Sequence, residues 1–102
     1  MTEKLERLAS AGIQLLPALE ITTHYVFERD GFVALVERTS EGFGGIGSAG
    51  LLTGSGFAAL IERRGRSYFK GRNFEQEAQP EQVQALRRFS ADLRDAISDG
   101  KL

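Results

Sequence analysis

A glycine-rich segment is the part of this sequence whose residue types and spacing most resemble a ligand-binding motif. Residues 41–56 hold seven of the twelve glycines, and Gly45–Gly50 fits the pattern G-x-G-x-x-G. In dinucleotide-binding proteins such glycines let the backbone approach a pyrophosphate, and the helix that follows binds it through free N–H groups. No helix can follow here, because further glycines come at once and strand-forming residues resume at Phe57. We therefore expect a strand or turn over residues 43–52 that binds no dinucleotide cofactor.

A small ligand or an anion is the alternative that this segment leaves open. Successive backbone N–H groups in a glycine-rich turn can form a concave anion site. The single histidine, His24, is the default acid–base residue, because its ordinary pKa lies near neutrality. On this alternative the protein binds a small molecule, or is a modest enzyme, through the Gly44–Gly50 segment and His24. The candidate ligand-binding residues are Gly45, Gly47, Ser48 and His24.

The surroundings of His24 do not make a recognisable catalytic or metal site. Glu37 is its expected cross-strand partner and could orient the imidazole, but no serine or threonine stands in a nucleophile motif. With no cysteine and one histidine, a zinc site would need carboxylates for its other ligands, which is uncommon. We interpret His24 and Glu37 as a pair on a sheet surface, and we assign no catalytic residue, metal or cofactor.

A basic stretch, residues 63–72, carries five arginine or lysine residues around Tyr68 and Phe69. Positive charge interleaved with aromatic rings is typical of proteins that bind single-stranded nucleic acid. Strand alternation, however, sends the two rings to opposite faces, and the chain as a whole has a net charge of −1. We interpret the stretch as a solvated hairpin rather than as a nucleic-acid site.

The elements that must position these residues begin with a hairpin, His24–Arg38. Asp30 and Gly31 suit a two-residue turn in which both central residues have positive φ. This turn predicts a register in which Phe27 faces Ala34 and His24 faces Glu37. A second hairpin is expected from Phe57–Glu62 and Ser67–Lys70, around a turn at Arg64-Gly65. Because Arg64 suits a turn less well than Asp30, a turn of three or four residues is the alternative here.

Helices are expected at the two ends of the chain. A short one runs from about Thr2 to Ala11, and Ile13–Leu19 then forms an extended connection to a first strand that begins at Glu20 or Ile21. Residues 71–79 are expected to be a polar connection. Pro80 suits the first position of the last helix, in which apolar residues recur at spacings of three and four. They are Val83, Leu86, Phe89, Leu93 and Ile97.

Together these elements predict an α+β fold in a single domain over residues 1–102. A four- to five-stranded antiparallel meander carries a short N-terminal helix and a C-terminal amphipathic helix packed on one face. No signal peptide or membrane-spanning stretch is evident, so we expect a soluble, cytoplasmic protein.

The last expectation is a homodimer. The hairpin register sends apolar residues to both faces of the sheet, whereas two helices can cover only one of them. An apolar patch on the other face is most simply buried by a two-fold related copy. We therefore expect a non-enzymatic, self-associating interaction module. Its candidate interface residues are Val26, Val33, Leu35 and Glu37.

Overall fold

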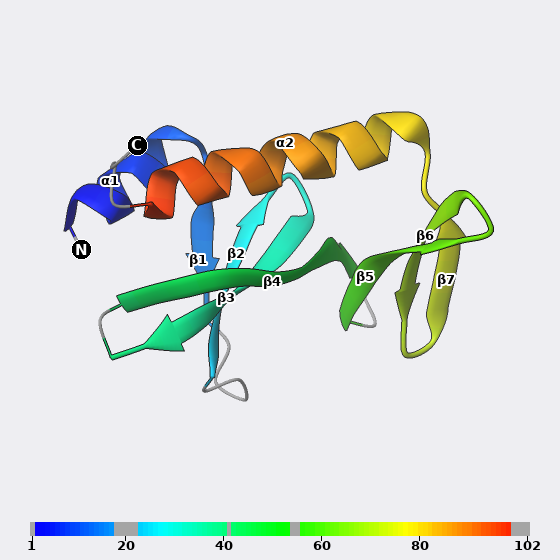
Figure 1. Cartoon of the computed structure of the whole chain (residues 1–102), viewed down its shortest axis with the longest axis horizontal. Helices are drawn as coiled ribbons and strands as arrows, with labels where there is room; N and C mark the ends of the chain where they lie inside the picture. Colours follow the sequence, from blue (N-terminus) through cyan, green and yellow to red (C-terminus); the bar gives the residue numbers. More distant parts are fainter. Residues whose placement is uncertain (1, 18–22, 41, 54–55, 99–102) are drawn as a thin grey trace.

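The computed structural model shows two helices and one antiparallel sheet, which confirms the α+β prediction (Figure 1). It describes residues 2–17, 23–40, 42–53 and 56–98. The sheet is a meander in which each strand pairs with the next along the chain. The elements in order are α1 (Thr2–Ser10), β1 (Gln14–Leu16), β2 (His24–Arg29), β3 (Phe32–Thr39), β4 (Gly42–Thr53), β5 (Gly56–Arg63), β6 (Arg66–Gly71), β7 (Phe74–Glu77) and α2 (Pro80–Ile97).

Seven strands form the sheet, so the expectation of four to five was wrong. The two additional strands are its edges. β1 lies in what we expected to be an extended connection, and β7 lies in what we expected to be a polar connection. Both are short, at three and four residues. The expected start of the first hairpin strand, at Glu20 or Ile21, lies outside the described residues.

The two predicted hairpins have the expected turns. Asp30 and Gly31 have φ values of 55° and 87°, and the register of β2 with β3 pairs His24 with Glu37, as predicted. At the second turn Arg64 also has a positive φ, 54°, although arginine has no special preference for it. The flanking residues Arg63 and Arg66 pair directly, so this turn too has two residues.

The glycine-rich segment forms a full strand, β4, with two irregularities in its pairing to β3. Two residues of β4 face one residue of β3 at each place: Gly44-Gly45 lies opposite Glu37, and Gly47-Ser48 lies opposite Leu35. This two-to-one arrangement is a β-bulge, which bends a strand and increases its twist. The glycines of residues 44–47 therefore lie at the bends of a long strand.

Gly50 serves a different purpose, because the backbone of β5 occupies the space that its side chain would need. A Cβ atom at this position would overlap the carbonyl oxygen of Ala58 and would lie 2.8 Å from the Ala59 Cα. On the other side of β5, a Cβ at Gly71 would lie 2.7 Å from the carbonyl oxygen of Phe57. β5 is thus held between two glycines that leave room for its backbone. At these two positions backbone, and not a side chain, occupies the space over the glycine.

The C-terminal helix packs its apolar stripe on one face of the sheet, as predicted. Leu86, Phe89, Leu93 and Ile97 are buried, and Val83 is partly buried against the same core. The helix begins at Pro80, where the side chain of Gln82 accepts a hydrogen bond from the backbone N–H of Gln79 at 2.8 Å. The strand residues beneath the helices include Phe27, Ala34, Val36, Ala58 and Phe69.

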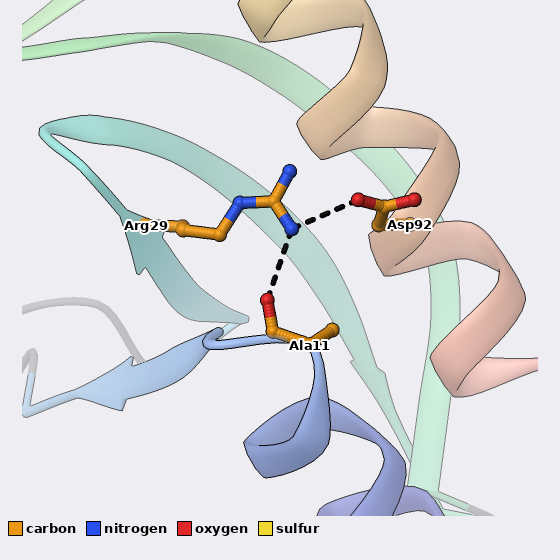
Figure 2. A network of polar contacts seen from close by, with 3 residues as sticks. All are labelled: Ala11, Arg29 and Asp92. Carbon is orange, nitrogen blue, oxygen red and sulfur yellow. Dashed lines mark hydrogen bonds and ion pairs between the residues drawn. The ribbon is translucent and has the colours of Figure 1, made fainter.

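Arg29 links β2 to α2 and to the turn that follows α1 on this covered face (Figure 2). Its guanidinium donates hydrogen bonds to the Asp92 carboxylate of α2 at 2.8 Å and to the carbonyl oxygen of Ala11 at 3.0 Å. The same group lies 5.6 Å from the centre of the Phe89 ring. Arg7 of α1 bonds the carbonyl oxygens of Ala96 and Ser98, which fixes α1 against the end of α2 (Figure 1). These contacts hold both helices on one side of the sheet.

Candidate functional site

The far face of the sheet, opposite the helices, is the largest candidate site. The strand registers place there a set of apolar residues that runs from β1 to β6. We call this set the far-face patch: it consists of Leu16, Val26, Val33, Leu35, Leu52, Phe57, Ala59, Ile61 and Tyr68. None of these residues belongs to the core cluster beneath the helices. In the part of the chain that the structure describes, no helix packs over them.

Exposure differs along the far-face patch. Leu52 is 49% exposed, whereas Val33, one of the predicted interface residues, is only 1% exposed. The predicted interface residues Val26 and Leu35 are half-buried, and Glu37 is exposed. Val33 lies outside the core cluster beneath the helices, so that cluster does not account for its low exposure.

Charged residues lie at the two ends of the far face and differ in sign. Glu28 and Glu37 lie at the β2–β3 end. At the β5–β7 end three bases, Arg63, Arg66 and Lys70, outnumber two acids. Those two acids are Glu75, which contacts Arg63 at 3.0 Å and Lys70 at 3.9 Å, and Glu77, which lies 3.8 Å from Arg66.

Glu28 is tied to its own end of the sheet by two hydrogen bonds. The side-chain amide of Gln14 donates to one carboxylate oxygen at 2.6 Å, and the backbone N–H of Gly31 donates to the other at 2.9 Å. These bonds favour the ionised form and hold the pKa of Glu28 below its ordinary value, the Gln14 amide contributing most. Glu28 therefore stays negatively charged at neutral pH.

His24 and Glu37 are register partners on the far face, but no hydrogen bond or ion pair joins their side chains. The Nδ1 atom of the half-buried His24 lies 2.8 Å from the hydroxyl of Thr23. No group of three or more histidine or acidic residues in the described ranges is arranged to hold a metal ion. This arrangement suits a polar rim beside the far-face patch.

The glycine motif lies elsewhere, beside α2. Gly47 and Ser48 line a cleft of about 500 Å³ between β4 and that helix. His24 is not among the residues that line it, so the structure does not bring the four predicted ligand-binding residues together. Gly45 is exposed at the neighbouring bulge. The full lining of the cleft is Gly47, Ser48, Ala49, Leu60, Leu86, Arg87, Ser90 and Arg94.

The basic hairpin forms a separate hollow, of about 480 Å³, at the β5–β6 turn. It is lined by Arg63, Arg64, Arg66 and Tyr68, and the Arg63 guanidinium lies 5.0 Å from the centre of the Tyr68 ring. Two of the three arginines already have acidic partners on β7. Phe69 is fully buried under the helices, so only one of the two rings is available for stacking on a base.

Sequence reasoning missed the arginines beside the glycine motif. Arg87, Ser90 and Arg94 follow the three-and-four spacing of one helix line, next to the apolar stripe. That spacing could have been read from the sequence. It could not have been connected with Ser48 without knowledge of which strand lies under the helix.

Searches against protein-family models, curated proteins and solved structures found no match for this chain. Neither helix in the described ranges is long and apolar enough to cross a lipid bilayer. The geometry of the surfaces themselves is therefore the basis for the functional argument.

Proposed function

We propose that this chain is a non-enzymatic, self-associating interaction module, and that the far face of the sheet is the interface of a homodimer. The observation that carries the proposal is the far-face patch, which continues across six neighbouring strands. Monomeric proteins rarely expose contiguous apolar patches larger than a few hundred Å². A standard interface removes about 800 Å² from each partner, and a broad sheet face is a surface of suitable size and shape.

The distribution of charge favours a second copy of the same chain as the partner. A two-fold axis that runs in the interface, along the central strand, lays the β2–β3 end of one copy on the β5–β7 end of the other. The acids Glu28 and Glu37 of each copy then face the more basic end of its partner. Apolar residues at the centre and charged residues at the rim are the usual composition of an interface.

The packing of Val33 supports the same surface. A residue of a sheet face without helices is ordinarily exposed, yet Val33 is 1% exposed. A side chain that is already packed in one chain loses less conformational entropy on association than a mobile side chain does. Leu52, at 49% exposure, retains the most area that a partner could still bury.

A charged substitution at Leu52 tests the proposal, and Leu15 supplies a matched control. Both are strand leucines of nearly equal exposure, 49% and 48%, but Leu15 pairs with Phe27 and so lies on the opposite face. Leu52→Asp should convert the dimer to a monomer in size-exclusion chromatography with light scattering, because it buries a charge without a partner. Leu15→Asp should remain dimeric.

Two results would contradict the proposal. One is a Leu52→Asp variant that remains dimeric at micromolar concentration while its circular dichroism spectrum is unchanged. The other is loss of the dimer in both variants, because the far face would then have no special part in association.

A further inference from the structure

The cleft between β4 and α2 carries an inference that is independent of self-association. We propose that it binds a small organic anion, with an acidic group such as a phosphate monoester or carboxylate on a compact apolar body. Its volume of about 500 Å³ lies within the range of about 300–1,000 Å³ that small-molecule sites occupy. The acidic group and the apolar body correspond to two chemically different sides of the cleft.

The charged side of the cleft comes from α2. Arg87 and Arg94 are both exposed and both line the cleft. No ion pair to an acid is found for either one within the described residues, in contrast to Arg29, Arg63 and Arg66. Seven residues of helix separate them by about 10 Å along the axis, with the Ser90 hydroxyl between. Two long guanidinium side chains can converge on one anion across this distance, each through charge-assisted hydrogen bonds.

The opposite wall supplies backbone donors from the second bulge of β4. Gly47 and Ser48 together face Leu35 of β3, so one of them is the extra residue that a bulge leaves outside the ladder. β5 pairs with β4 only from Gly50 to Thr53, so the other edge of the bulge meets no described strand. Backbone N–H groups on this open edge of β4, together with the Ser48 hydroxyl, are suitable donors to an anion.

The floor of the cleft is apolar and selects the body of the ligand. It is formed by Ala49 and Leu60, which are partly buried, and by Leu86, which is 3% exposed. A free inorganic anion would leave this floor in contact with water. An anion with a compact apolar body would cover it and gain the hydrophobic term as well as the ionic one.

The bulges also make an extended peptide a poorer occupant than a small molecule. A peptide strand that adds to a sheet edge needs a regular row of free donors and acceptors. Bulges are among the devices by which natural proteins prevent such pairing. β4 has two of them in its pairing with β3, within the stretch whose other edge meets no described strand. The irregular edge can still surround a compact anionic group.

The test uses phenyl phosphate as the probe. Inorganic phosphate, which has only the anionic group, and phenol, which has only the apolar ring and a hydroxyl, are the two comparison ligands. Titrations followed by amide NMR should show saturable shifts at Gly47, Ser48 and Ser90, and no comparable shifts at Val26 or Leu35 of the far face. Phenyl phosphate should bind more tightly than either comparison ligand. Binding of phosphate as tight as that of phenyl phosphate would refute the role of the apolar floor.

Two double variants with the same change in net charge separate a specific site from general attraction. Arg87→Gln with Arg94→Gln should weaken the binding of phenyl phosphate at least about tenfold, because losing even one charge-assisted hydrogen bond costs about a decade in affinity. Arg64→Gln with Arg88→Gln removes two exposed arginines outside the cleft and should change the affinity less than threefold. Equal losses in the two variants, or no saturable shift in the unchanged protein, would overturn the proposal. The dimer should be unaffected by either variant, so this test can fail without affecting the proposed function.

Discussion

Replacing Gly50 with alanine should destabilise the fold strongly, because the space for a side chain is occupied by backbone. The added Cβ would overlap the carbonyl oxygen of Ala58 and lie 2.8 Å from the Ala59 Cα. A side chain could rotate away from such a contact, whereas a neighbouring strand must move as a whole. Inserting a group into a filled space costs about 1–3 kcal/mol, and we expect about 3 kcal/mol here because the obstacle is backbone.

Gly45 is the matched control, since it belongs to the same G-x-G-x-x-G motif. A Cβ at Gly45 meets no atom within 4 Å, so Gly45→Ala should change the free energy of unfolding by less than about 0.5 kcal/mol. In urea, where small domains lose about 1–3 kcal/mol per molar, the Gly50→Ala midpoint should fall by about 1–3 M. Equal midpoints for the two variants would refute the interpretation that Gly50 is required for strand packing.

The remaining predictions concern charged side chains. A double-mutant cycle with Arg29→Met and Asp92→Asn, measured by urea unfolding, should give a coupling energy of about 0.5–1 kcal/mol, since the pair is partly exposed; zero coupling would show that this contact does not help hold α2. The lowered pKa of Glu28 means that its stabilising contribution is present above the unfolded-state pKa and is lost as pH falls through the folded-state pKa. Glu28→Gln should therefore be less stable than the unchanged protein at neutral pH, with a difference that disappears in acid; a difference independent of pH would contradict this. Finally, Arg64→Ala with Arg66→Ala should change the free energy of unfolding by less than about 0.5 kcal/mol. Fluorescence anisotropy should show no binding of a single-stranded oligonucleotide to the unchanged protein at low salt. Salt-sensitive binding that this variant loses would instead support a nucleic-acid site.

Local signals were sufficient to predict the hairpins and the last helix. Asp30-Gly31 fixes both a turn and a register, and the apolar spacing of residues 83–97 fixes a helix face. The edge strands β1 and β7 carry no comparable signal. They have only three and four residues, which is too few to show an alternating pattern of apolar and polar side chains. β7 is mostly polar, and its acids meet bases on β6, so its residues resemble those of a loop.

The glycine-rich strand shows why the candidate sites were only partly predictable. Its composition distinguished a strand from a dinucleotide motif, because no helix could follow. The positions of the bulges, and the point at which β5 leaves β4 after pairing as far as Gly50, depend on tertiary packing. The cleft beside Ser48 exists only because of those features, so Arg87 and Arg94 could not be recognised as its lining.

The far-face patch was predictable in kind but not in extent. The hairpin register alone identified Val26, Val33 and Leu35 as one apolar face. The contributions of Leu52 and Phe57 required the registers of β4 and β5, which a glycine-rich segment specifies weakly. The covered face is the one that carries Phe27 and Arg29, and Arg29 bonds Asp92 of α2 and the carbonyl oxygen of Ala11, just after α1.

Sedimentation equilibrium of the unchanged protein is the most direct test of self-association through the far face. Over a tenfold range of micromolar concentrations, we predict a species of twice the 11.2 kDa of one chain. Dissociation at the dilute end should follow a single monomer–dimer equilibrium. A single species of 11.2 kDa at every concentration would contradict the account.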